Sequence, residues 1–317
     1  MTILITGIHG FVGSGFTKAF HDHHLIYGLD ILTQDKTGVI KNFLWPDINI
    51  NKLPEVDVII HLAGKAHDTR NSSNAKSYFD INTGLTQIIF DKFISSSAGK
   101  FIFFSSVKAA ADKVEGDFLT EDVNPAPVGP YGESKIKAEE YILDKIRENP
   151  EKFSGKRVYI LRPCMIHGPG NKGNLNLLYR IAKTGIPWPL GSFENKRSFT
   201  SFDNLAFIVD KLIVSDVESG IYNISDDSPL STNELIKLMA CSVGKKAHVL
   251  NVNKSFISFC AKLGDILHLP LNTLRLQKLT ENYIVSNVKI KKALKIDSLP
   301  FTSSEGMIKT LNSFRND

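Results

Sequence analysis

Tyr131, Lys135 and Ser106 are the residues whose types and spacing best suit proton transfer. Tyr131 and Lys135 are four residues apart, and on a helix such a pair lies on one face. A phenol has a pKa of about 10 in water, too high for a base at neutral pH. A nearby ammonium would lower that pKa, so Tyr131 could exchange a proton with a substrate hydroxyl. Ser106 ends an expected strand, where its hydroxyl could orient the same oxygen. An exposed helical pair with no catalytic role would have the same spacing, so the context decides.

A glycine-rich segment, Gly7–Gly13, follows an expected strand and opens an expected helix. Its small residues permit a tight turn and let backbone N–H groups approach a pyrophosphate at the positive end of the helix. Asp30 ends the next expected strand, where an acid accepts hydrogen bonds from an adenosine ribose and repels a 2′-phosphate. No arginine follows at residues 31–33. The pattern indicates a dinucleotide site that prefers NAD. A plain strand–helix turn and an acid that caps a strand are the alternatives.

The first half of the chain supplies a scaffold for these residues in a regular rhythm. Short apolar segments are expected to form buried strands at residues 2–6, 25–30, 57–63, 100–106 and 158–162. Helices are expected between them, at residues 13–21, 74–97 and 134–149. This alternation predicts an α/β fold with a Rossmann-like, doubly wound parallel sheet, whose ligands lie at the carboxyl ends of the strands.

After Pro163 this rhythm is lost, and Gly- and Pro-rich segments separate helices expected at residues 175–184, 231–243 and 288–294. We expect an NAD-binding domain over residues 1–165, rejoined by residues 198–218, and a smaller α+β substrate lobe over residues 166–317. Residues 255–271 come nearest to the ~20 apolar residues of a membrane span, but Lys262 and Asp265 interrupt them. We interpret them as an amphipathic helix that faces the core, with contact to a membrane surface as the alternative.

Composition argues against several classes of function. The formal net charge of +5 is too small, and is expected to be too evenly spread, for a nucleic-acid partner. Three cysteines far apart in sequence favour a reducing compartment over a disulfide framework, and no basic leader is recognisable. The histidines at positions 21, 23 and 24 lack further ligands for a metal ion. We therefore expect a cytoplasmic protein with no metal, no nucleic-acid partner and no membrane span.

Together these motifs resemble the extended short-chain dehydrogenase/reductases, in particular the NAD-dependent nucleotide-sugar epimerase/dehydratase family of polysaccharide biosynthesis. The matching positions run in family order along the chain. They are Gly7–Gly13, Asp30, Asp47-Ile48, His61-Leu62-Ala63-Gly64, Asn82, Ser105-Ser106, Tyr131–Lys135, Arg162-Pro163, Arg197 and Asp203-Asn204-Leu205.

The resemblance implies a role for each of these positions. It makes Ser106, Tyr131 and Lys135 catalytic, and it makes Lys135 a ribose ligand as well. It implies that NAD contacts Gly7, Gly10, Phe11, Val12, Gly13, Asp30, Asp47, Ile48, Leu62, Ala63, Gly64, Asn82, Ser105, Tyr131, Lys135 and Pro163. It implies that a nucleotide sugar, expected to be UDP-linked, contacts Ser106, Asn174 and Arg197, with Arg275 as a second phosphate contact. A guanidinium at Arg197 suits a phosphate because it can bind in a forked manner. A homodimer through two helices beside the active site is also implied.

Two activities fit these residues. In a 4-epimerase of a UDP-hexose or UDP-N-acetylhexosamine, Tyr131 removes the C4 hydroxyl proton while NAD takes the C4 hydride, which then returns to the other face of the 4-keto sugar. The alternative is an NAD(P)H-dependent reductase of a nucleotide-linked 4-keto-6-deoxy sugar. Asp30 favours the epimerase. Val107 and Lys108 disfavour a 4,6-dehydratase, which usually has Asp-Glu there, and the presence of Tyr131 and Lys135 disfavours a non-catalytic protein. The sugar, and whether it is lipid-linked, stay open.

Overall fold

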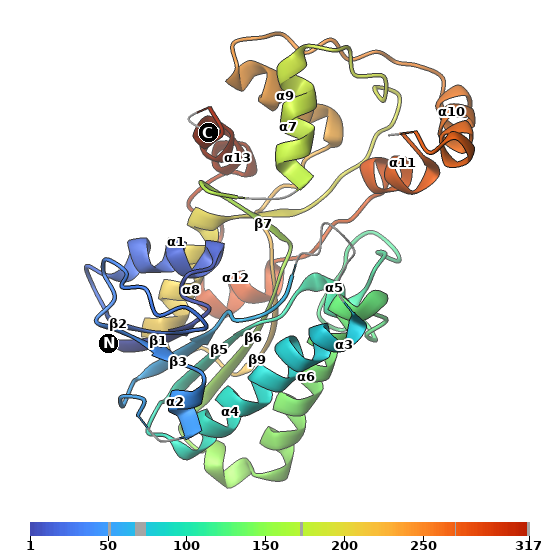
Figure 1. Cartoon of the computed structure of the whole chain (residues 1–317). Helices are drawn as coiled ribbons and strands as arrows, with labels where there is room; N and C mark the ends of the chain where they lie inside the picture. Colours follow the sequence, from blue (N-terminus) through green and yellow to red (C-terminus); the bar gives the residue numbers. More distant parts are fainter. Residues whose placement is uncertain (50–51, 67–73, 172–173, 270, 316–317) are drawn as a thin grey trace.

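The computed structural model describes residues 1–49, 52–66, 74–171, 174–269 and 271–315, without the side chains of residues 49 and 174. Within these residues a seven-stranded sheet is covered by helices on both faces, and a smaller lobe lies beyond the carboxyl ends of its strands (Figure 1). The expected α/β, Rossmann-like class is confirmed.

All strands of the main sheet are parallel, in the order β3-β2-β1-β4-β5-β6-β9. Their bounds are β1 (Thr2–Thr6), β2 (Leu25–Asp30), β3 (Lys41–Leu44), β4 (Val58–His61), β5 (Lys100–Phe104), β6 (Arg157–Pro163) and β9 (Gly220–Ile224). The five strands expected from the sequence are confirmed, with β4 and β5 shorter than expected. Two strands were not predicted from the sequence: β3, which is short and begins with polar residues, and β9, which lies after the rhythm of strands and helices has changed.

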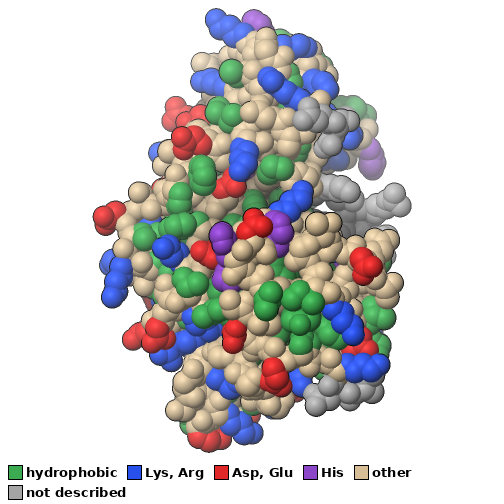
Figure 2. Space-filling view, turned by 90° about the vertical axis from the view of Figure 1, so that its left-hand side faces the viewer, with side chains coloured by type: hydrophobic (Ala, Val, Ile, Leu, Met, Phe, Trp, Pro, Cys, Tyr) green, Lys and Arg blue, Asp and Glu red, His purple; other side chains and the backbone are tan. Residues whose placement is uncertain are grey.

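Both faces of the sheet are buried, because successive side chains of a strand point to opposite faces. In β1, Ile3 and Ile5 pack in one hydrophobic cluster and Leu4 in another. The first cluster is covered by α1 (Phe11–Phe20), α8 (Phe202–Val214) and α12 (Val288–Leu294), and the second by α4 (Leu85–Ser95) and α6 (Gly129–Glu148). On the side of the molecule that carries α1, acidic, basic and hydrophobic side chains are interspersed (Figure 2).

The central strands end level with one another. Thr6 at the end of β1 pairs in register with Leu29 and His61, and His61 pairs with Phe103. The residues that follow these ends therefore meet at one edge of the sheet, the usual place for a ligand in this architecture.

The lobe has a hydrophobic core of its own, which includes Leu175, Trp188, Met239 and Met307. Its elements are α7 (Asn174–Thr184), α9 (Thr232–Ser242), α10 (Lys254–Leu267), α11 (Thr273–Thr280) and α13 (Ser303–Ser313), with β7 (Met165–His167) and β8 (Phe199–Ser201) as a two-stranded sheet beneath them. The expected helix at residues 255–271 is α10, and its buried face joins this core. None of the helices in the described ranges is long and apolar enough to span a bilayer.

Short elements surround the sheet edge: α2 (Pro46–Asn49), α3 (Ala75–Tyr78), a π-helical segment (Phe79–Gly84), α5 (Val107–Ala110) and a 3₁₀ turn (Pro150–Phe153). The single helix expected at residues 74–97 is thus α3, the π-helical segment and α4 in succession. Such π-helical insertions are frequent at functional sites.

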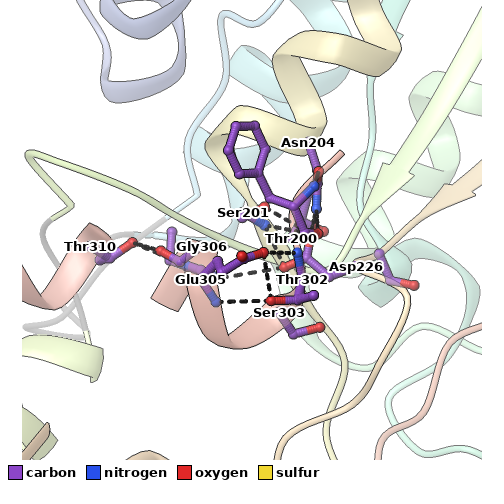
Figure 3. Close-up of polar contacts among 12 residues, drawn as sticks. Thr200, Ser201, Asn204, Asp226, Thr302, Ser303, Glu305, Gly306 and Thr310 are labelled. Atoms are coloured by element: carbon purple, nitrogen blue, oxygen red, sulfur yellow. Dashed lines mark hydrogen bonds and ion pairs between the residues drawn. The ribbon is translucent and has the colours of Figure 1, made fainter. Parts of the chain in front are cut away.

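A buried polar cluster fixes the lobe to the sheet (Figure 3). Asp226, which follows β9, accepts hydrogen bonds from Ser201 N (3.1 and 3.0 Å), Ser201 Oγ (2.9 Å) and Asn204 Nδ2 (2.8 Å). Asn204 also donates to the carbonyl of Phe301 at 2.8 Å, just before α13. The cluster therefore joins β8, α8 and the segment that enters α13, and it sets the height of the lobe above the sheet edge.

Candidate active site

A cleft of about 1110 Å³ lies where the sheet edge faces the lobe. Its volume is slightly above the usual range for ligand sites in proteins, about 300 to 1,000 Å³. The sequence-predicted residues that line it are Gly7, Gly10, Phe11, Val12, Gly13, Leu62, Gly64, Ser105, Ser106, Tyr131, Lys135, Pro163 and Arg197. Folding therefore brings most of the predicted site into one cavity.

Ser106 and Tyr131 lie together in this cleft. Ser106 is the N-cap of α5, and its Oγ accepts a hydrogen bond from Lys108 N at 3.2 Å. Tyr131 lies in the first turn of α6, and both side chains line the cleft. The structure thus places both hydroxyls where one substrate oxygen could meet them. Their catalytic roles stay a prediction.

The surroundings of Tyr131 favour the neutral phenol. Burial raises the pKa of Tyr131, the neighbouring Ser106 hydroxyl opposes that shift, and the electrostatic effect of Tyr78 on α3 adds to it. The two tyrosine rings are 6.5 Å apart in an edge-to-face arrangement. The sequence analysis expected Lys135 to lower this pKa, but within the protein alone Ser106 is the group that favours the phenolate.

Lys135 is buried behind the tyrosine, with its side chain 5% exposed. Its Nζ donates a hydrogen bond to the carbonyl of Phe104 at 2.7 Å and lies 5.0 Å from the ring centre of Phe103. Burial lowers the pKa of Lys135 to about 8, and the carboxylate of Glu139 opposes this shift. The ammonium is therefore costly to bury, and Glu139 helps to retain its charge.

Glu139, one helical turn after Lys135, forms a buried ion pair with Arg162. Arg162 Nε donates to both carboxylate oxygens (3.0 and 3.1 Å) and Nη2 donates to one at 2.5 Å. Ser105 Oγ donates to the same carboxylate. The predicted cofactor residue Ser105 thus lines the cleft while it is held by Glu139. Glu139 was not predicted from the sequence, although it lies four residues after Lys135 on one helix, a spacing at which side chains interact.

The glycine loop has the geometry that a dinucleotide requires. Gly7 has φ of +69°, and a Cβ there would lie 2.9 Å from Ala63 N. A Cβ at Gly13 would lie 2.4 Å from Gly7 O. The loop is therefore open only because these positions lack side chains, and α1 begins at Phe11 with its N-terminus at the cleft. These residues fit the phosphates of NAD.

Asp30 and Asp47 lie at the far end of this loop, outside the residues that line the cleft. Asp30 is buried, and its carboxylate accepts hydrogen bonds from His9 N (2.9 Å) and Ile31 N (2.7 Å). Asp47 lies in α2 with Ile48 and accepts from Leu44 N at 2.8 Å. His9 lines the cleft, so Asp30 directly orients a residue of the predicted adenosine side.

Ala63 and Asn82 also lie behind the cleft wall. Ala63 N donates to Thr6 Oγ1 at 3.0 Å. Asn82, on the π-helical segment, is fully buried; it accepts from Lys65 N at 2.7 Å and donates to Ser134 Oγ at 2.9 Å. It therefore fixes the segment after β4 to α6, the helix that carries Tyr131 and Lys135.

On the lobe side, Arg197 lines the cleft. Its Nη1 donates to the carbonyl of Lys278, and its Nη2 lies 3.7 Å from a carboxylate oxygen of Glu281. The position of Asn174 begins α7, but its side chain lies outside the described part of the structure. Arg275 lies on α11 and is not among the residues that line the cleft.

Lys108 and Tyr283 complete the cleft wall and were not predicted. Lys108 Nζ lies 4.5 Å from the centre of the Tyr283 ring and 2.9 Å from Asp112 Oδ1. The Tyr283 hydroxyl donates to the carbonyl of Ala111 at 2.7 Å. No spacing rule connects Tyr283 with α5, because only the fold brings them together.

Comparison with known proteins identifies the family of this chain. Residues 3–225 match the NAD dependent epimerase/dehydratase family. The chain is 32% identical to a UDP-glucose 4-epimerase of Vibrio cholerae, over 79% of this chain and 78% of that protein. It is 27% identical to the N-acetyl-alpha-D-glucosaminyl-diphospho-ditrans,octacis-undecaprenol 4-epimerase of Escherichia coli O157:H7, over 98% of this chain and 94% of that protein. The solved structure of UDP-glucose 4-epimerase with UDP-glucose from Thermotoga maritima has the same fold, with a TM-score of 0.74 at 21% identity over 100% of this chain and 99% of that one.

The family match covers well over half of the chain, and the relative with 32% identity is matched over most of both lengths. The expected family and cofactor are thereby confirmed. The chain belongs to the NAD dependent epimerase/dehydratase family and is an NAD-dependent enzyme of the extended short-chain dehydrogenase/reductase type.

Proposed function

We propose that this enzyme is a 4-epimerase of a UDP-linked hexose or N-acetylhexosamine. The observation that carries the proposal is the pair of hydroxyls of Ser106 and Tyr131 in the cleft, with the buried ammonium of Lys135 one helical turn away. The relative of Vibrio cholerae is a UDP-glucose 4-epimerase, which supports both the reaction and the nucleotide.

In the proposed reaction the residues of the chain orient the sugar and move one proton. Ser106 Oγ donates to the C4 oxygen, and Tyr131 accepts the C4 hydroxyl proton as the carbonyl forms. Bound NAD would supply the acceptor, and then the donor, of the C4 hydride. Because burial favours the neutral phenol, the phenolate would form only with NAD bound, when the positive nicotinamide ring would act together with Lys135 to stabilise it. Tyr131 then gives its proton back, so no external reductant is consumed.

The two ligands are proposed to occupy opposite sides of the cleft. The glycine loop with Leu62, Gly64 and Pro163 would hold NAD, with Asp30 at its adenosine end. Arg197 would bind the diphosphate of the sugar nucleotide, because a bidentate phosphate contact is stronger than its 3.7 Å ion pair with Glu281. Ser106 is the substrate contact nearest the chemistry.

Purified enzyme tests the reaction. We expect interconversion of UDP-N-acetylglucosamine and UDP-N-acetylgalactosamine, or of the corresponding hexoses, with no added reductant and with NMR as the readout. Tyr131→Phe should be slower by about 10² to 10⁴ fold, because it removes the general base. Tyr141→Phe is the matched control: Tyr141 lies on the same helix and donates to Asp91 at 2.7 Å, so its loss should leave turnover intact. Full activity of Tyr131→Phe would exclude this mechanism, and a requirement for stoichiometric NAD(P)H would instead favour the 4-keto-6-deoxy sugar reductase.

A lipid-linked sugar diphosphate is the second candidate substrate. The relative of Escherichia coli O157:H7, whose name describes an undecaprenol-linked substrate, matches nearly the whole chain. The specific observation that favours this class is the exposed apolar face of α10. The same assay with a polyprenyl-diphosphate sugar in detergent separates it from a UDP-linked substrate.

We further propose the cellular and quaternary setting. Residues 1–165, rejoined by residues 198–218, would hold NAD, and residues 166–317 would hold the sugar. A homodimer would form through α4 and α6, the two helices beside the site. A cytoplasmic location is supported by three cysteines without a disulfide. Light scattering on wild type and on a variant of the exposed Ile88 of α4 tests the dimer.

A further inference from the structure

The face of α10 that points away from the lobe core is made of large apolar side chains. Phe256, Phe259 and Ile266 are 59%, 57% and 72% exposed, and Leu263 and Leu267 are exposed beside them. These residues are three or four apart, so they form one face of the helix. The opposite face, with Ile257 and Ala261, packs in the lobe core. Leu269 and Leu274 extend the exposed apolar surface beyond the helix. We call these seven exposed residues the α10 face.

The α10 face is held firmly in place. A Cβ at Gly264 would lie 1.8 Å from the carbonyl oxygen of Leu271, so the segment after α10 packs directly on the helix backbone. Both carboxylate oxygens of Asp265 accept hydrogen bonds from Thr273, at the start of α11. The apolar side chains are therefore displayed on a rigid pair of helices. Figure 1 shows α10 and α11 at the outer edge of the lobe, above α5 and α3.

The segment of the chain that contains this face is basic. Residues 245–280 contain six lysines and arginines and a single acid, Asp265, which is occupied by Thr273. Their net charge of +5 equals the formal net charge of the whole chain, so the remaining residues are neutral overall. A rigid apolar face within a basic segment is the pattern of helices that lie in the interface of an anionic bilayer.

We propose that the α10 face docks the enzyme on an anionic membrane surface. The apolar side chains enter the interface between headgroups and acyl chains, and the surrounding basic residues contact anionic headgroups. A second copy of the chain is the weaker occupant, because two such faces would bring two segments of +5 together. The docking does not depend on which sugar is used, but it would bring the cleft to a substrate carried on a lipid.

Vesicle flotation of the full-length enzyme tests the proposal. We expect binding to vesicles that contain phosphatidylglycerol, weaker binding to pure phosphatidylcholine, and release by salt. Phe259→Ser with Ile266→Ser should reduce binding at least about tenfold, since each removes a large apolar side chain from the interface. Lys262→Glu should weaken binding only where the vesicles are anionic. Val214→Ser with Val288→Ser is the matched control, because both residues are exposed, apolar and remote from α10.

Turnover of a soluble UDP-sugar by these variants shows that they fold, and it reports on the proposed function separately. Failure of the wild type to bind anionic vesicles, or equal binding by Phe259→Ser with Ile266→Ser, would overturn the proposal. A change from dimer to monomer by light scattering in that variant, without loss of vesicle binding, would assign the face to a second copy instead.

Discussion

The buried pair of Glu139 and Arg162 allows a prediction whose size follows from its geometry. Glu139 is fully buried and Arg162 is 2% exposed, so neither charge is solvated by water. Glu139→Gln keeps the shape of the side chain but removes the charge that the guanidinium faces. Arg162 Nη1 already has no hydrogen-bond partner among the described residues, so little is available to compensate. Leaving a buried charge unpaired costs about 3 to 5 kcal/mol, and we expect a loss of this size.

Urea unfolding at neutral pH measures this loss. Glu140→Gln is the matched control, since Glu140 lies next on the same helix, is exposed and is 3.5 Å from Lys137. Its loss should change the free energy of unfolding by less than about 0.5 kcal/mol. If the free energy of unfolding of Glu139→Gln were within about 1 kcal/mol of the wild-type value, the ion pair would not contribute the stability that its burial implies.

The same substitution has a second, independent consequence at Lys135. The pKa of Lys135 is about 8, and Glu139 is the group that raises it against burial. Without that carboxylate the ammonium loses its proton at lower pH. The alkaline decline of kcat/KM should therefore begin at lower pH in Glu139→Gln than in the wild type. An unchanged pH profile would refute the coupling even if stability fell.

Three further predictions concern other parts of the molecule. Lys135→Met should abolish turnover yet leave the free energy of unfolding at pH 7 unchanged or higher by up to about 2 kcal/mol. Burial lowers the pKa of Lys135 from 10.5 to about 8, so the buried charge destabilises the folded protein at pH 7 and its removal is stabilising. The carbonyl of Phe104, which loses its hydrogen bond, reduces that stabilisation. A variant destabilised by more than about 1 kcal/mol would contradict this. Asp226→Asn should lower the free energy of unfolding by about 2 to 3 kcal/mol, and with it the unfolding midpoint, because the carboxylate accepts hydrogen bonds from both Ser201 and Asn204. A midpoint equal to that of the wild type would show that the polar cluster does not fix the lobe to the sheet. Asp30→Ser should reduce the preference for NAD over NADP, measured as the ratio of their dissociation constants by calorimetry, since the acid repels a 2′-phosphate. An unchanged ratio would mean that Asp30 only holds His9 in place.

Much of the fold was predictable because its signals are local. Short apolar segments alternating with helices indicated the parallel sheet, and five of its seven strands were predicted from such local patterns. The strands β3 and β9 did not, because one is short and polar at its start and the other is separated from its neighbour β6 by residues of the lobe. Parallel pairing joins strands that are distant in sequence, and no periodicity records such a pairing.

For the site, the sequence alone indicated which residues could carry the chemistry: a tyrosine and a lysine one helical turn apart, a serine at a strand end, and glycines where a dinucleotide needs open backbone. Tertiary structure decided the electrostatics. Burial, which depends on what packs around a group, raises the pKa of Tyr131 and lowers that of Lys135. The tertiary structure also placed Asn82 and Asp30 outside the cleft lining and Tyr283 within its wall. The sequence shows α10 as amphipathic, but only the packing of the lobe shows that one apolar face remains exposed, since exposure depends on neighbours that are remote along the chain.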